Sequence, residues 1–252
     1  MDILEHREKL IKSDKPSDVI KEVYKVFSHD ENKHVGFDYT DRIITEFKRS
    51  PINVNENEYI RLLHKVMYVN TVVHYSIFKE SALLEIDGLV EEKIAQEFRM
   101  HNTNGTLCMY ASVLLYKLLI SDTQLESFNE QTLKYVQGYY QHKVRERTLL
   151  RMLVPQSLAV HAFLTFDDTI VDATINQIEE NYDEQALYFA IGDKGGTPDE
   201  NRWFGIVENQ STIDAYIQDF IEAHGYENKE QWIEKHNDSI YSVLTKLSEF
   251  IS

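Results

Sequence analysis

The spacing of the apolar residues changes twice along this chain, and this change constrains the fold more than any other feature. Up to about residue 120, apolar residues recur three and four positions apart, which places them on one face of a helix. From residue 133 to residue 207 the apolar segments are short, rich in Val, Ile, Tyr and Phe, and separated by turn-forming residues. Helical spacing returns from Ser211. The order of helices, one antiparallel sheet and further helices predicts an α+β fold.

The predicted elements divide the 252 residues into a helical N-terminal region (1–90), a core (91–210) and C-terminal helices (211–252), which together can form one domain. Residues 107–120 are apolar on nearly every side, and such a helix belongs in the centre of a domain. The sequence STID at 211–214 resembles a capping box that starts the next helix. The other predicted helices are 17–27, 39–47, 55–75 and 82–100. The last is interrupted or bent near Gly88 and is followed by a polar loop at 101–106. The predicted strands are 133–144, 158–166, 169–174, 186–191 and 203–207.

The chain has 26 basic and 42 acidic residues, a net charge of −16 with histidine neutral. This balance gives no electrostatic basis for binding nucleic acid or an anionic membrane, so we expect neither as a partner. The N-terminal sequence MDILEHREKL lacks the apolar segment of a signal peptide, and residues 111–120, the most apolar stretch, are too short to span a bilayer. The single cysteine excludes an intramolecular disulfide, and we therefore expect a cytoplasmic protein.

The only cysteine, Cys108, follows the polar segment 101–106 and lies at the start of the predicted buried helix. At a helix N-terminus the unpaired backbone N–H groups and the helix dipole stabilise a thiolate, which is the nucleophilic form of cysteine. A buried helix also accommodates cysteine as a small apolar residue. Cys108 alone therefore does not establish a nucleophile.

Residues 158–174 (LAVHAFLTFDDTIVDAT) predict a β-hairpin that turns at residues 167–168. With a two-residue turn, Phe166 pairs with Thr169, and alternation places His161 and Asp172 on one face as diagonal neighbours. An aspartate that accepts a hydrogen bond from one imidazole nitrogen fixes the tautomer and leaves the other nitrogen as a base. Beside Cys108, this pair would complete a set of nucleophile, base and orienting carboxylate. The opposite face of the hairpin is uniformly apolar, with Val160, Ala162, Leu164, Phe166, Val171 and Ala173.

Taken together, these segments resemble the transglutaminase-like cysteine enzymes within the papain-like group. The matching sequences are NGTLCMYASVLLYKLL (104–119), HAF (161–163) and VDAT (171–174), and LKYVQGYYQ (133–141) resembles the connecting strand of that family. The resemblance covers about residues 100 to 176. It implies a buried helix packed on an antiparallel sheet, with Cys108 as the nucleophile, His161 as the base and Asp172 as the orienting residue.

Three positions differ from the usual pattern of the family. Gly105 lies three residues before the cysteine, where two is common; Phe163 stands where Trp is common, and Ala173 where Pro is common. The donor that would stabilise an oxyanion is left open by the sequence. The candidates are the backbone N–H of Cys108 and the side chains of Gln96, Asn102 and Asn104.

The resemblance implies thiol-dependent acyl chemistry at a peptide or side-chain amide, through a thioester that is released to water or to an amine. The expected substrates are a peptide, a protein or a small amide, and the sequence does not define the acyl acceptor or the oligomeric state. The alternative is a catalytically inactive protein of the same fold that acts as a binding module. We expect no cofactor and no metal, because the ten histidines form no metal-binding motif; His64 and His74 are interpreted as surface or core residues, and GDKGGT (192–197) as a hairpin loop.

Overall fold

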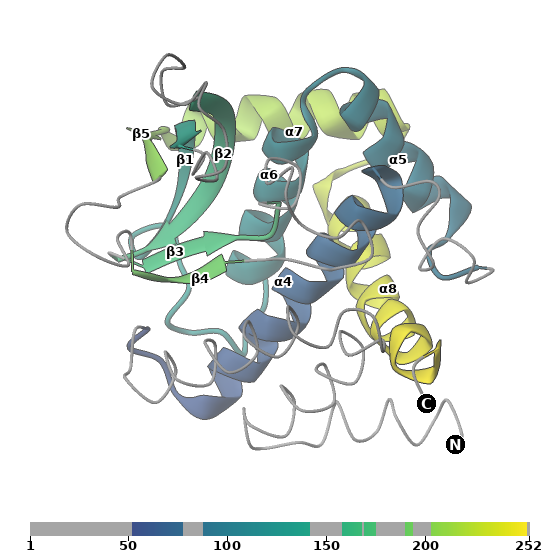
Figure 1. Cartoon of the computed structure of the whole chain (residues 1–252), viewed down its shortest axis with the longest axis horizontal. Helices are drawn as coiled ribbons and strands as arrows, with labels where there is room; N and C mark the ends of the chain where they lie inside the picture. Colours follow the sequence, from purple (N-terminus) through teal and green to yellow (C-terminus); the bar gives the residue numbers. More distant parts are fainter. Residues whose placement is uncertain are drawn as a thin grey trace, which may run out of the picture.

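The structure is a computed structural model that describes residues 52–77, 88–141, 158–167, 169–174, 190–193 and 203–250. The helices predicted at 17–27 and 39–47, and the loop predicted at 192–197 beyond residue 193, lie outside the described residues. The described part of the chain is an α+β structure, as predicted (Figure 1). Its elements are α4 (Glu56–Ile77), α5 (Glu92–Thr103), α6 (Leu107–Ile120), β1 (Leu133–Gln141), β2 (Leu158–Phe166), β3 (Thr169–Asp172), β4 (Ala190–Asp193), β5 (Trp203–Val207), α7 (Gln210–His224) and α8 (Lys229–Phe250).

The predicted and observed elements agree best where the apolar pattern is strongest, since α6, β2 and β5 have the predicted bounds. Of the two forms expected for the helix at 82–100, an interruption near Gly88 is confirmed, since Gly88 has a φ of +64° and α5 begins at Glu92. This helix also continues to Thr103, so the polar loop is shorter than predicted. The start of α7 is corrected as well, because Asn209 caps the helix by accepting from the backbone N–H of Thr212.

The five strands form one antiparallel sheet in the order β4-β3-β2-β1-β5. The predicted register of the β2–β3 hairpin is confirmed, with Phe166 opposite Thr169. On the other side of the sheet, β1 and β5 approach closely where Gly138 lies opposite Gly205. A Cβ atom at Gly138 would lie 1.8 Å from the carbonyl oxygen of Phe204, so only glycine fits at this crossing.

Helix α6 occupies the centre of the molecule, between the sheet and the other helices (Figure 1). It contacts β1 and β2 on one side and α4, α5, α7 and α8 on the others, which explains why it is apolar all round. Ser112 ties the helix to the sheet by donating a hydrogen bond of 2.9 Å to the carbonyl oxygen of Ala162. Residues from all three predicted regions of the chain share the core that surrounds α6.

The apolar face of the hairpin packs into this core, with one exception. Ala162, Leu164, Phe166, Val171 and Ala173 are all buried, as predicted. Val160 lies on the same face by alternation but is 77% exposed. It lies opposite Tyr139, which is itself 49% exposed, so the helices that the structure describes leave this end of the sheet open.

The second face of the sheet is also buried around the hairpin, where Val136, Phe163 and Ile170 form a smaller apolar cluster with Trp203 against it. By alternation, His161 and Asp172 point to this second face. Both side chains are therefore buried beside the smaller apolar cluster. Among the described residues, no helix is long and apolar enough to cross a membrane.

Candidate active site

The thiol of Cys108 is placed by the start of α6. Cys108 is the second residue of this helix, after Thr106 at the N-cap and Leu107 at the first helical position. Its side chain is half-buried and free of any disulfide. The first turn of a helix carries backbone N–H groups without intrahelical acceptors, so this cysteine lies where an anion is stabilised.

His161 and Asp172 form the hydrogen bond that the hairpin register predicts. The ring Nε2 of His161 donates to Oδ2 of Asp172 over 2.6 Å, and both side chains are fully buried. Two further residues hold the carboxylate. Thr174 donates to Oδ1 through its backbone N–H (2.8 Å) and its hydroxyl (3.0 Å), and the indole N–H of Trp203 donates to Oδ2 over 2.9 Å.

These contacts set the charge of the pair. Burial of the His161 ring favours its neutral form, but the charge and hydrogen bond of Asp172, with a smaller contribution from Cys108, raise its pKa to about 9. Burial would raise the pKa of Asp172, yet His161, Trp203 and Thr174 together hold it below the usual value. The pair is therefore an imidazolium facing a carboxylate near neutral pH.

The remaining ring nitrogen of His161, Nδ1, is buried and has no well-aligned hydrogen bond to any described residue. The thiol of Cys108 lies close enough to the ring to raise its pKa through a hydrogen-bond contact and through charge. The structure thus brings together the three residues that the sequence pattern singled out. A thiol, an imidazole and a carboxylate in this order can act as nucleophile, base and orienting group.

The three side chains considered as oxyanion donors lie at the surface of the molecule. Gln96, Asn102 and Asn104 are all exposed, and the amide of Gln96 donates to Glu92 over 2.9 Å. All three lie on or just after α5, where the chain faces away from the core.

An amide on β1 is held by two tyrosine hydroxyls. Gln137 on β1 donates from Nε2 to the hydroxyls of Tyr135 (2.9 Å) and Tyr216 (3.0 Å). Burial raises the pKa of Tyr135, and the charge of Cys108 adds to the effect, which places this tyrosine near the thiol. Gln137 is not among the candidates drawn from the sequence, because its partner Tyr216 lies far along the chain.

Comparison with known proteins identifies no homologue or structural neighbour of this chain. Scans against protein-family models, curated proteins and solved structures find no match to this chain. The case for a site rests on the residues themselves.

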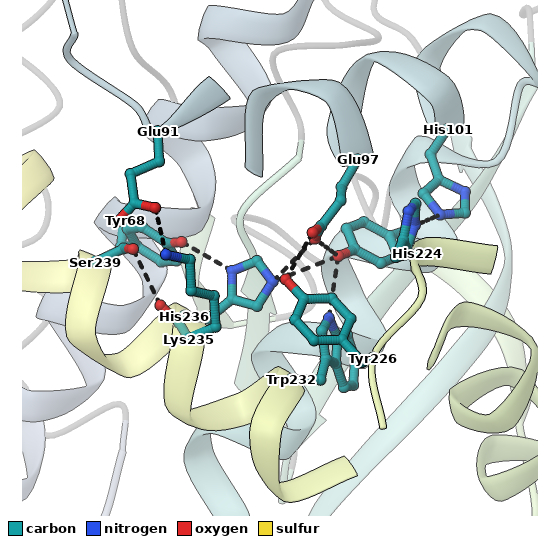
Figure 2. A network of polar contacts seen from close by, with 11 residues as sticks. Tyr68, Glu91, Glu97, His101, His224, Tyr226, Trp232, Lys235, His236 and Ser239 are labelled. Carbon is teal, nitrogen blue, oxygen red and sulfur yellow. Dashed lines mark hydrogen bonds and ion pairs between the residues drawn. The ribbon is translucent and has the colours of Figure 1, made fainter. Parts of the chain in front are cut away.

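A second polar cluster lies on the helical side of the molecule, around the carboxylate of Glu97 on α5 (Figure 2). Glu97 accepts hydrogen bonds from the hydroxyls of Tyr110 (2.7 Å) and Tyr226 (2.6 Å) and pairs with Nε2 of His236 at 3.3 Å. His236 in turn contacts the hydroxyl of Tyr68 through Nδ1 at 2.8 Å. All members are buried, so this cluster, which the sequence analysis did not identify, holds helices together and is closed to substrate.

The part of the chain that the structure describes contains no group of three or more His, Cys, Asp or Glu side chains suited to a metal ion. The sequence allowed His64 and His74 to be either surface or core residues. Both lie on α4 and are buried in the core. Burial, together with the nearby charges of Lys65 and Arg61, lowers the pKa of His64 to about 3, so its ring is neutral.

Proposed function

We propose that this protein catalyses thiol-dependent acyl chemistry at a peptide or side-chain amide, with Cys108 as the nucleophile, His161 as the acid and base, and Asp172 as the orienting carboxylate. The transglutaminase-like cysteine enzymes, which the sequence segments resemble, would be its functional relatives.

One observation carries the proposal. The His161–Asp172 hydrogen bond of 2.6 Å is buried, while Nδ1 of the same ring has no well-aligned partner and lies by the only thiol of the chain. A buried polar atom left without a hydrogen bond is costly, so a ring nitrogen of this kind that lies beside a thiol is a candidate for a catalytic contact. In a purely structural pair, both ring nitrogens would be expected to have partners.

The reaction would proceed in two steps. The Cys108 thiolate attacks the carbonyl carbon of the substrate, a C–S bond forms, and the tetrahedral oxyanion collapses as the C–N bond breaks. The imidazolium of His161 gives its Nδ1 proton to the leaving amine. Water or a second amine then attacks the thioester, transfers its proton to Nδ1, and releases the thiolate of Cys108.

The raised pKa of His161 suits this scheme, because the ring is then protonated near neutral pH and can pair with the Cys108 thiolate. Asp172 supports the imidazolium through its own charge and fixes the ring so that Nδ1 is directed away from the carboxylate. The acyl acceptor is set by what reaches the thioester, so hydrolysis and transfer to an amine belong to the same proposal.

The test uses p-nitrophenyl acetate, an activated ester that acylates nucleophilic thiols. We expect the native protein to release p-nitrophenol and gain one acetyl group on Cys108, seen by mass spectrometry of the intact protein. Cys108→Ala should abolish the labelling, because the chain has no second thiol. His161→Ala should reduce the rate of labelling nearly to that level.

Two results would overturn the proposal. A native protein whose Cys108 reacts only after denaturation would have a structural thiol. A rate of labelling that is the same in the wild type and in His161→Ala would show an ordinary exposed thiol with no catalytic partner. Either result would favour the alternative of a binding module built on the same fold.

A further inference from the structure

The N-cap of α6 has an unusual arrangement. A threonine at the N-cap normally accepts a hydrogen bond from the backbone N–H of the second or third helical residue, here Cys108 or Met109. Thr106 occupies the N-cap and makes no such bond. Its hydroxyl is instead 2.9 Å from Nδ1 of His101, on the last turn of α5.

His101 is held firmly in the position that engages Thr106. Its ring stacks on Tyr110 with centroids 4.2 Å apart and planes 13° apart, and its Nε2 is 2.9 Å from Nε2 of His224 (Figure 2). The backbone adds a second link, because the N–H of Thr106 donates to the carbonyl oxygen of His101 over 2.9 Å. The Thr106 hydroxyl is therefore directed at α5 and away from its own helix.

As a consequence, the first N–H groups of α6 have no acceptor among the described residues. Tyr110 is the first residue whose N–H finds a helical partner, the carbonyl oxygen of Thr106 at 3.0 Å. The N–H of Cys108 is thus open at the same place where the thiol lies by the buried, unpartnered Nδ1 of His161. A carbonyl oxygen of a substrate attacked by the thiol would reach this N–H.

We propose that His101 is a positioning residue that diverts the Thr106 hydroxyl from capping α6 and so keeps the N–H of Cys108 available to the oxyanion. This inference rests on the proposed function of the site. Thr106 has φ −114° and ψ 13°, outside the extended conformation of a capping threonine, and its bond to the His101 ring helps to hold it there. Without that ring, Thr106 would be released to adopt the extended conformation and to accept the N–H groups of the first turn.

The experiment separates oxyanion binding from thiol reactivity by comparing two reagents. Acetyl transfer from p-nitrophenyl acetate passes through a tetrahedral oxyanion, whereas alkylation by iodoacetamide displaces iodide at a saturated carbon and forms none. The ratio of the acylation rate to the alkylation rate of Cys108 therefore reports the N–H groups that bind the oxyanion.

Four variants complete the design. His101→Phe keeps the stack on Tyr110 and loses the hydrogen bond, Thr106→Val keeps the shape of threonine and cannot cap, and the third variant combines both. His224→Phe is the matched control, because it removes only the outer bond of His101 and leaves the bond to Thr106 in place.

We expect His101→Phe to lower the rate ratio at least about tenfold, since losing one oxyanion donor costs about a hundredfold or more in well-studied enzymes. Thr106→Val and His224→Phe should stay within about threefold of the wild type, because neither gives the helix a cap. The double variant should recover the wild-type ratio, a rescue that a merely structural role of His101 would not produce. If His101→Phe does not fold, Thr106→Asn takes its place, because asparagine is a stronger cap and should lower the ratio with His101 intact.

The inference is overturned if His101→Phe keeps the wild-type ratio, or if the double variant remains as slow as His101→Phe alone. If His101→Phe does not fold and Thr106→Asn is used in its place, an unchanged rate ratio in Thr106→Asn overturns the inference. Failure of the proposed function is recognised separately, because the wild type would then show no acylation of Cys108 that depends on His161.

Discussion

At the scale of single residues, the buried His161–Asp172 pair is the most demanding feature of the molecule. Two charges are removed from water, and such a pair is stable only when additional hydrogen bonds hold it. Thr174 and Trp203 supply these bonds to the carboxylate. On the histidine side, Nε2 bonds to Asp172, and Nδ1 has no well-aligned hydrogen bond to any residue in the described part of the chain.

The first expected outcome concerns Asp172→Asn. The amide of asparagine can donate to Nε2, which would favour the tautomer with the proton on Nδ1 and remove the charge that supports the imidazolium. The rate of acetyl transfer to Cys108 should fall strongly, but by less than the factor of about ten thousand known for the equivalent change in a serine triad, because a thiol is the better nucleophile. An unchanged rate in a folded variant would remove Asp172 from the mechanism.

The second expected outcome is a dependence of stability on pH. Folding raises the pKa of His161 from 6.5 to about 9, so the folded protein binds this proton more tightly than the unfolded chain. The stabilisation is complete below pH 6.5 and is lost as the pH rises through about 9. At the acidic end, the lowered pKa of Asp172 preserves the pair until the pH falls below the ordinary range of an aspartate.

The measurement is the melting temperature of the wild type and of His161→Gln between about pH 6 and pH 10, since the comparison cancels the other titrating groups. The advantage of the wild type should shrink across this interval. A constant difference would mean that His161 is neutral in the folded protein.

At the scale of elements, β2 and α6 have the bounds predicted from the sequence, and β3 ends two residues earlier than predicted, at Asp172. Each of these elements is encoded by a local pattern. Alternation in β2 and β3 fixes the register, and the register alone brings His161 and Asp172 together. The start of α7 was misplaced for a local reason, since Asn209 and Ser211 are both good N-cap residues and the pattern does not distinguish them.

The crossing of β1 and β5 at Gly138 gives the third expected outcome. Gly138→Ala would place a Cβ atom against the backbone of Phe204, and β5 would have to move. Because β5 carries Trp203, which donates to Asp172, the change should slow acetyl transfer to Cys108 as well as destabilise the fold by about 1–3 kcal/mol. Lys134→Ala is the control, in the same strand but outside the pairing with β5, and should alter neither quantity. Normal stability in Gly138→Ala would show that the strands do not meet as closely as described.

At the scale of the whole molecule, the arrangement that the sequence could not predict is the cluster around Glu97. Its members come from α4, α5, α6, the residues before α8, and α8 itself, and they are separated by up to 168 residues along the chain. No local period connects Tyr68 with His236, and a buried glutamate cannot be distinguished from a surface one by its neighbours in sequence. The same limit applies to Gln137, whose partner Tyr216 belongs to α7.

The cluster around Glu97 also contacts α6, the helix that carries Cys108. Tyr110, which donates to Glu97, lies on α6 two positions after Cys108 and stacks on His101. The position of α6, and with it of Cys108, therefore depends on the carboxylate of Glu97.

The last expected outcome tests this dependence through Glu97→Gln, which keeps the size of the side chain and removes its charge. The buried partners of Glu97 would lose an anionic acceptor, and removing one member of a buried pair costs about 3–5 kcal/mol. Tyr226→Phe is the matched control, because it removes a single hydrogen bond to Glu97 and should cost about 1–2 kcal/mol.

Since hydrogen bonds and His236 hold the pKa of Glu97 below its usual value despite burial, the stabilisation is present above about pH 4.5 and is lost as the pH falls through the lowered pKa. Urea unfolding at neutral pH and near pH 3 should show a large difference between wild type and Glu97→Gln that narrows in acid, and an equal difference at both would show that Glu97 contributes packing and no charge.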